Sequence, residues 1–194
     1  MKIAIDIDDT LTKVDRVTHT LQYIKENNLN FKLLNPDAHA ISEIFDWTYE
    51  DAFNFVRAGG GAVIFTQAPV REGAKETIAG WRAAGHRVTI LTARTKDWFS
   101  EPEALSREQL DKNQIPYDEI VAGVYEKGAY CKEHGIEILI EDNFEICKVA
   151  QELGVKAIMF LDKHNLEHQD EITYTVSTWE QAGSLVAQIL NSEN

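Results

Sequence analysis

Short runs of apolar, largely β-branched residues alternate along the chain with longer segments that place apolar residues at helical spacing. Near-continuous Ile, Val and Leu in a run is typical of a strand buried on both faces, and parallel strands need crossover helices between them. The pattern therefore predicts an α/β fold with a parallel sheet. The predicted strands are Ile3 to Ile7, Arg87 to Leu91, Glu119 to Ala122, Glu137 to Glu141, Val155 to Phe160 and a weaker Ile172 to Val176.

Glycine follows three of the predicted helices, as is common where a helix ends; these are Gly85, Gly135 and Gly154. A last helix begins at the capping-box pattern of Ser177 to Glu180 and has one apolar stripe, so we expect it to cover a face of the sheet. The earlier predicted helices are Val70 to Ala84, Ser106 to Asn113, Lys127 to His134 and Phe144 to Leu153.

The interval between the first strand and the helix at Val70 is too long for a simple crossover. We interpret residues 13–67 as a small, mostly helical insertion, and residues 1–12 and 68–194 as the core domain. Within the insertion, Asn35-Pro36 predicts one helix start and Thr48 another. The run Gly59 to Gly61 predicts a flexible exit.

Charge and composition exclude several classes of function. The chain has 194 residues, and 32 Asp and Glu against 19 Lys and Arg give a formal net charge of −13. Such a charge repels DNA, RNA and anionic membranes, so no nucleic-acid polymer or membrane partner is expected. Cys131 and Cys147 have no metal-ligand spacing and predict buried apolar residues. Since no signal region or membrane span is visible, we expect a cytoplasmic location.

Acidic residues follow two of the predicted strands. Asp6 and Asp8 share one side in IDIDDT, and Glu141-Asp142 follow the run EILI. The carboxyl edge of a parallel sheet is where α/β folds bind ligands. Carboxylates gathered there repel one another unless a cation lies between them, and an all-oxygen set suits Mg²⁺ better than a transition metal. The alternative is ordinary acidic turns and helix starts.

A hydroxyl and two basic side chains join these acids as candidates. Thr92 and Arg94 end a predicted strand, and Lys127 opens the helix before EILI. A hydroxyl and a guanidinium suit phosphate oxygens, although each residue alone is also explained as a strand end or a surface charge.

Taken in order, these residues resemble the motifs of the haloacid dehalogenase superfamily of phosphatases. The resemblance covers residues 1 to about 12 and 68–160 and rests on Asp-x-Asp-x-Thr at Asp6 to Thr10, then Thr92, Lys127 and Glu141-Asp142. Response regulators carry similar residues, but their phosphoacceptor follows a third strand, so we discard that interpretation. The stretches LTARTKDW and LIEDN are similar to the bacterial 5'(3')-deoxyribonucleotidases and related nucleotidases.

The resemblance implies a Rossmann-like parallel sheet with a small helical cap after the first strand, and a Mg²⁺-dependent phosphomonoesterase that forms an aspartyl phosphate. It implies catalytic roles for Asp6, Asp8, Thr92 and Lys127. It implies Mg²⁺ held by Asp6, Asp8 and Asp142 with Glu141 beside it, and substrate-side roles for Arg94 and Thr10, the latter through the loop geometry. Dehalogenases of the superfamily lack an acid at the place of Asp8, which favours phosphate-ester hydrolysis.

The expected substrate is a small phosphorylated metabolite, with a nucleoside monophosphate preferred and a sugar phosphate or another metabolite as the alternative. A catalytically silent phospholigand binder is less favoured, because no motif residue is missing. Aromatic residues of the insertion would stack on a base, and Trp47 and Tyr49 are the candidates. We expect Phe45, Phe53 and Phe55 to form the insertion's own core instead.

Two remaining polar clusters predict solvent-exposed segments. His164 and His168 lie four apart in HNLEH, a spacing that would also suit a helical metal site, but the polar surroundings favour a surface loop. Asp15-Arg16 predicts an ordinary solvated face.

Overall fold

The computed structural model describes residues 1–192, and within that range the strands form one parallel sheet in the order β3-β2-β1-β4-β5-β6. All six predicted strands are present, so the predicted α/β class is confirmed. The strands are β1 (Lys2–Ile5), β2 (Arg87–Thr92), β3 (Glu119–Ala122), β4 (Ile138–Glu141), β5 (Lys156–Phe160) and β6 (Tyr174–Val176).

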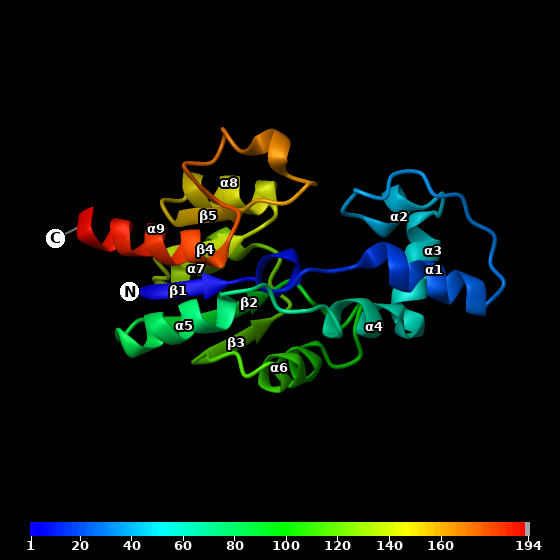
Figure 1. The fold of residues 1–194 in the computed structure, drawn as a ribbon, viewed down its shortest axis with the longest axis horizontal. Coiled ribbons are helices and arrows are strands. Elements are labelled where there is room, and N and C mark those ends of the chain that lie inside the picture. The colour runs from blue at the N-terminus through cyan, green and yellow to red at the C-terminus, as the bar shows by residue number, and fades with distance from the viewer. Residues whose placement is uncertain (193–194) are drawn as a thin grey trace.

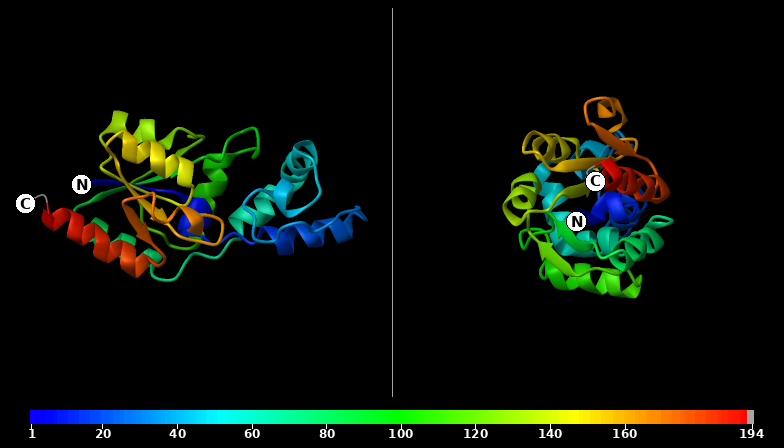
Figure 2. Two further views of the ribbon diagram at one scale, coloured as in Figure 1. Left: turned by 90° about the horizontal axis from the view of Figure 1, so that it is seen from above. Right: turned by 90° about the vertical axis from the view of Figure 1, so that its left-hand side faces the viewer.

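Helices cover both faces of the sheet (Figures 1 and 2). One face packs against α5 (Ala74–Ala83), α6 (Pro102–Lys112) and α9 (Trp179–Ser192), and the other against α7 (Lys127–His134) and α8 (Phe144–Glu152). Strand β1 shows the alternation that this burial requires, because Ile3 and Ile5 enter one apolar cluster and Ala4 enters the other. Cys131 and Cys147 are buried in the second cluster, as predicted.

Several helix starts differ from the prediction, and each difference has a local physical cause. Val70 forms an isolated antiparallel bridge with Thr12, so α5 begins only at Ala74. Helix α6 begins earlier than predicted, with Pro102 in its first turn. The cap of α9 is Thr178, not Ser177, since the Thr178 hydroxyl accepts the backbone N–H of Gln181 at 3.2 Å.

The segment between β1 and α5 is helical, and its helices lie together at the carboxyl end of β1 (Figure 1). We call residues 13–67 the cap and the rest the core; this division into domains stays a prediction. The elements of the segment are η1 (Ile7–Leu11), α1 (Arg16–Glu26), α2 (Ile41–Ile44), α3 (Tyr49–Phe55), η2 (Val56–Gly60) and α4 (Gly61–Thr66), and a short η3 (Leu166–His168) follows β5.

Local predictions within the cap have mixed outcomes. Thr48 caps α3 in a complete capping box with Asp51. The predicted helix start at Asn35-Pro36 is wrong, because the Asn35 side chain accepts the Asp37 N–H at 3.1 Å and holds a turn. In the predicted flexible exit, Gly59 forms a kink at φ 108° and the next two glycines lie in helical turns, while the flexibility itself stays a prediction.

Tertiary packing in the cap centres on a separate apolar cluster that includes Ile44, Phe45, Phe55 and Ile64. Gly60 belongs to this packing, since a Cβ there would lie 2.3 Å from the Phe55 ring. Among the described residues, no helix combines the length and the apolar character that crossing a bilayer demands.

Helix α7 packs closely against α8, and this contact depends on Gly128. The packing fixes the position of Lys127, the first residue of α7. A Cβ at Gly128 would lie 2.9 Å from the backbone of Ala150, whereas a Cβ at the exposed Gly80 of α5 would meet nothing within 4 Å. We expect Gly128→Ala to lower the free energy of unfolding by about 1–2 kcal/mol, because overpacking exceeds the gain in helix propensity. Gly80→Ala should raise it by about 0.5–1 kcal/mol. Urea titration of both variants checks this; a stabilised Gly128→Ala protein contradicts it.

Candidate active site

The carboxyl ends of β1 and β4 lie side by side at the point where the strand order reverses. Asp6 follows β1, and its backbone N–H donates to the Ile140 carbonyl of β4 at 3.0 Å. Glu141 ends β4 and Asp142 follows it, while Thr92 ends β2 on the other side of β1. In open α/β sheets this crevice is the ligand-binding position. The sheet thus brings together residues that are far apart in the sequence.

Lys127 connects the acids that follow the two strands. Its ammonium donates to Asp6 Oδ1 in a very short contact and to Glu141 Oε2 at 2.5 Å. Lys127, Asp6 and Glu141 are exposed by only 2%, 5% and 2%, so these charges interact with little screening by water. Burial alone would lower the pKa of Lys127, but the two carboxylates raise it above its ordinary value. The lysine is therefore held charged.

One lysine does not neutralise the acids around it. Burial, together with the charge of Glu141, raises the pKa of Asp6 to about 8, although Lys127 opposes the shift. Burial likewise raises the pKa of Glu141 to about 7 and also raises that of Asp142. Asp6, Glu141 and Asp142 each offer an oxygen atom, and these atoms lie within 4.8 Å of one another. A buried set of oxygen ligands with more negative charge than Lys127 can neutralise fits a Mg²⁺ ion.

Asp8 and Arg94 form a bidentate pair. Arg94 donates from Nη2 to Asp8 Oδ1 at 2.6 Å and from Nε to Oδ2 at 2.9 Å. The guanidinium also donates to the Ser106 hydroxyl at 3.1 Å and the Phe65 carbonyl at 3.4 Å, and it lies over the rings of Phe65 and Phe99. The guanidinium is 3% exposed. This bidentate pair lets Arg94 orient Asp8, and Arg94 also lines the cavity over the acids, so its predicted phosphate contact stays a prediction.

Asp142 is held by side chains from two other segments. The Thr10 hydroxyl donates to Oδ1 at 3.0 Å, and Thr10 is fully buried, so it supports this carboxylate and the loop rather than a substrate. His164 Nε2 lies 2.9 Å from Oδ2, and Asn165 donates to the Asp142 carbonyl at 2.7 Å. The prediction of a solvated surface loop is wrong for His164, whose side chain is 16% exposed.

Asp9 links the loop after β1 to the cap. It adopts φ 61°, an uncommon conformation for a residue with a side chain, and its Oδ2 accepts Arg16 Nη1 at 2.5 Å. A second Arg16 nitrogen lies 3.2 Å from His39 Nε2. The predicted solvated face is wrong for Arg16, which is 10% exposed. Burial and the charge of Arg16 lower the pKa of His39 to about 4.

Sequence reasoning missed the contributions of Asp9, Arg16, His39 and His164. The available signal was weak: HNLEH follows the β5 strand, whose carboxyl end lies beside that of β4. A histidine in a polar loop after such a strand can reach the ligand-binding edge of the sheet, but no local sequence pattern predicts the path of the loop.

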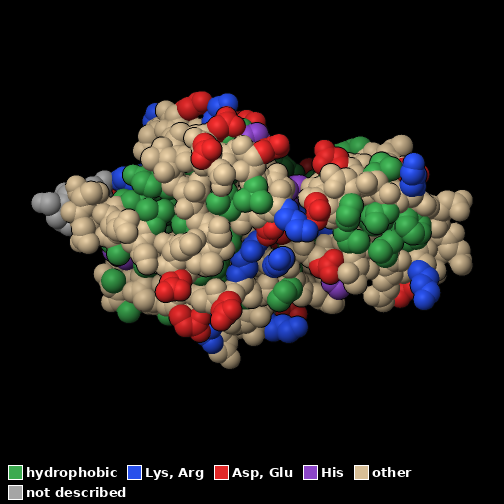
Figure 3. Space-filling model, turned by 45° about the horizontal axis from the view of Figure 1, so that its top comes forward, with side chains coloured by type: hydrophobic (Ala, Val, Ile, Leu, Met, Phe, Trp, Pro, Cys, Tyr) green, Lys and Arg blue, Asp and Glu red, His purple; other side chains and the backbone are tan. Residues whose placement is uncertain are grey.

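A cavity of about 620 Å³ opens over these acids, between core and cap. Charged and histidine side chains gather on the surface at this junction (Figure 3). The polar lining consists of Asp6, Asp8, Arg16, His39, Ser42, Thr92, Arg94, Lys127, Glu141, Asp142 and Asn143. The rest of the lining is apolar and aromatic, and it includes Tyr49, Phe65, Trp98, Phe99, Tyr125 and Ile146.

The two predicted base-stacking candidates separate in the structure. Tyr49 lines the cavity over the acids. Trp47 instead packs between Phe45 and Phe55, with ring centroids 5.6 Å from each, and lines a different cavity in the cap. Phe45 and Phe55 are buried as predicted. Phe53 stacks on Tyr49 at 6.2 Å and contacts Trp98, so it supports the cavity wall.

No family model and no curated protein matches the sequence, whereas many solved structures match the fold. A structure described as a predicted phosphatase from Clostridium acetobutylicum has 15% identity and a TM-score of 0.70, over 96% of this chain and 98% of that one. A predicted phosphoglycolate phosphatase from Haemophilus somnus has 14% identity and a TM-score of 0.67, over 95% and 96%. CbbY from Rhodobacter sphaeroides, solved with xylulose 1,5-bisphosphate, has 16% identity and a TM-score of 0.60, over 94% and 97%.

The chain has the haloacid dehalogenase fold. This agrees with the fold that the sequence motifs imply. Dehalogenases occur among the similar structures as well as phosphatases, so the haloacid dehalogenase fold alone does not select a reaction. The choice depends on the residues of this site.

The raised carboxyl pKa values predict how Mg²⁺ binding depends on pH. Without metal, acids with a raised pKa bind protons more tightly in the folded state than in the unfolded state. The free energy of unfolding therefore falls as the pH rises from about 4 toward 8. Mg²⁺ requires ionised oxygens and must displace these protons. We therefore expect Mg²⁺ to raise the Tm more near pH 8 than near pH 6, and Asp142→Asn to reduce the effect at both. Equal Tm shifts at the two pH values would contradict this.

Proposed function

We propose that the protein is a Mg²⁺-dependent phosphomonoesterase that acts through an aspartyl phosphate on Asp6. The observation that supports this best is the buried contact of Lys127 with both Asp6 and Glu141, next to Asp142. A structural ion pair would need only one acid for one lysine. The excess of carboxylates at the ligand-binding edge of the sheet favours a site for a cation and a phosphate.

In the proposed first step, a carboxylate oxygen of Asp6 attacks phosphorus, and the bond from phosphorus to the ester oxygen breaks. Asp8 gives its proton to the departing alkoxide. Both Asp8 oxygens accept from Arg94, but each has a second lone pair, so Asp8 can exchange a proton while Arg94 holds its orientation. The Thr92 hydroxyl and the Lys127 ammonium donate to the phosphoryl oxygens.

In the second step, water attacks the phosphorus of the aspartyl phosphate, Asp8 takes its proton, and inorganic phosphate leaves while the Asp6 carboxylate re-forms. Asp6, the Asp8 carbonyl and Asp142 would hold Mg²⁺, with Glu141 beside them. When bound, Mg²⁺ supplies positive charge that offsets the charge of the phosphate and the acids. The carboxylate of Asp142 is already oriented for this by Thr10 and His164.

A nucleoside monophosphate is the proposed substrate. The aromatic part of the cavity, with Tyr49, Phe65, Trp98 and Phe99, supports an aromatic group next to the phosphate. A sugar phosphate is the second candidate, favoured by the sugar bisphosphate that the similar CbbY structure contains. A cytoplasmic location stays a prediction from the sequence.

Replacing the nucleophile separates an enzyme from a silent binder. Asp6→Asn should lower Mg²⁺-dependent release of phosphate from an aryl phosphate by about three orders of magnitude or more, because a carboxamide is a poor nucleophile. The matched control is Asp170→Asn, which removes an exposed acid of the core and should leave turnover unchanged. Tm values check that both variants fold. Unchanged turnover in folded Asp6→Asn would exclude Asp6 as the nucleophile, and absent turnover in the wild type favours the silent binder.

The two tryptophans near the cap test the choice of substrate. Trp98 lines the cavity over the acids, whereas Trp47 lines the separate cavity. With a nucleoside monophosphate, Trp98→Ala should raise KM about tenfold, since stacking on a base is worth about 1–3 kcal/mol. Trp47→Ala should change KM little. Phosphate release across a panel of nucleotides and sugar phosphates measures this, and better kcat/KM for sugar phosphates would select the second candidate.

A further inference from the structure

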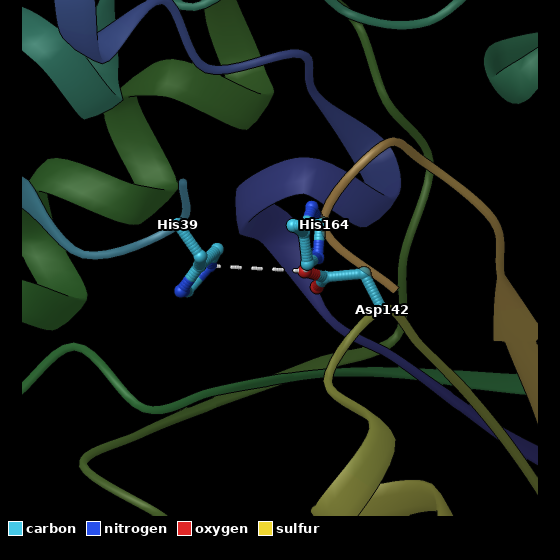
Figure 4. Close-up of side chains that lie close together, drawn as sticks. All are labelled: His39, Asp142 and His164. Carbon is cyan, nitrogen blue, oxygen red and sulfur yellow. Dashed lines mark hydrogen bonds and ion pairs between the residues drawn. The ribbon is translucent and has the colours of Figure 1, made fainter. Parts of the chain in front are cut away.

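Two imidazoles and a carboxylate converge where the cap meets the core. Figure 4 shows His39 extending toward the Asp142 carboxylate, beside which His164 lies. His164 Nε2 is 2.9 Å and His39 Nε2 is 3.9 Å from Asp142 Oδ2, and the three ligand atoms lie within 4.8 Å of one another. The residues come from the segment before α2, the end of β4 and the loop after β5.

The spacing of these atoms is close to that of a metal site. Ligand atoms about 2.0–2.1 Å from a tetrahedral ion lie about 3.4 Å apart. The two separations, 2.9 and 3.9 Å, lie on either side of that value. The shorter one is a hydrogen bond, and the ion would replace the proton on His164 Nε2. Asp9 Oδ2 lies 3.7 Å from His39 Nε2 but is already paired with Arg16, so water would complete the coordination of the ion.

The tautomer of His39 also suits a ligand. Arg16 Nη2 lies 3.2 Å from His39 Nε2, and a guanidinium can only donate a hydrogen bond. Nε2 therefore carries a lone pair and no proton. A metal ion would take over this lone pair, while Arg16 keeps its 2.5 Å contact with Asp9.

We propose that His39, His164 and Asp142 form a binding site for a Zn²⁺-type transition-metal ion that joins the cap to the core. Two imidazole nitrogens and one carboxylate oxygen suit Zn²⁺, Co²⁺ or Ni²⁺, whereas Mg²⁺ prefers oxygen ligands alone. The site thus differs in chemistry from the neighbouring set of Asp6, Glu141 and Asp142 and shares only Asp142 with it.

Metal in this site would restrain the cap. His39 belongs to the cap and His164 to the core, and strands β2 to β5 lie between them in the sequence. The centroids of their rings are already 4.8 Å apart. Because an ion bound only to the folded state stabilises it, Zn²⁺ should raise the Tm. The proposal does not depend on the phosphatase activity, since metal binding is measured without turnover.

Titration of Co²⁺ into the full chain, freed of transition metals and kept in excess Mg²⁺, tests the site. We expect visible absorption bands of Co²⁺ in a low-coordinate nitrogen and oxygen environment. His39→Ala and His164→Ala should each weaken Co²⁺ binding by about 100-fold or more, a larger effect than losing a group that only supports a ligand. His168→Ala is the matched control, because His168 lies in the same loop but contacts Glu171 and Phe144.

A further variant distinguishes the two neighbouring sites. Asp6→Asn should retain the Co²⁺ bands if the histidines bind the ion. Bands that disappear in Asp6→Asn and persist in both histidine variants would place the ion among the acids and overturn the proposal. Absence of Co²⁺ and Zn²⁺ binding in the wild type, or a Zn²⁺-induced rise in Tm that persists in His39→Ala, would also overturn it.

Discussion

The buried ammonium of Lys127 is the interaction on which the rest of the site depends. It begins α7, at the end of a helix where the macrodipole disfavours a cation, and it is surrounded by protein. A buried charge persists only when it is paired, and here Asp6 and Glu141 both pair with it. The pairing ties together the ends of β1 and β4 and the start of α7. It also leaves the site with more negative than positive charge, which is what makes it receptive to a metal ion.

The parts of the site that follow the sheet could be predicted from sequence. Strand ends were recognisable from apolar runs, and in a parallel sheet their carboxyl ends share one edge, so Asp6, Thr92 and Asp142 had to lie near one another. The ends of helices were harder to predict from sequence. Val70 continues the helical spacing of α5 but pairs with Thr12, a contact that only the folded chain provides.

Side chains whose role depends on a loop could not be predicted. The type and position of Arg94 predicted a phosphate ligand, but they gave no sign of its bidentate pair with Asp8. His164 lies in a polar stretch that looks solvated, and only the path of the loop after β5 brings it to Asp142. In the cap, Trp47 and Tyr49 are two residues apart and chemically similar, yet α3 begins between them, and one packs in the cap core while the other lines the cavity.

The position of the cap is coupled to the loop after β1 through Asp9. The exposed pair of Lys163 and Asp37 also joins core and cap, but a solvated pair of this kind contributes little. The contact of Arg16 with Asp9 is nearly buried and is therefore stronger. Asp9 holds its φ of 61° with further hydrogen bonds to Val14 and Arg71. Since Asp9 follows the proposed acid-base residue directly, a movement of the cap that breaks the contact with Arg16 acts on the backbone that orients Asp8.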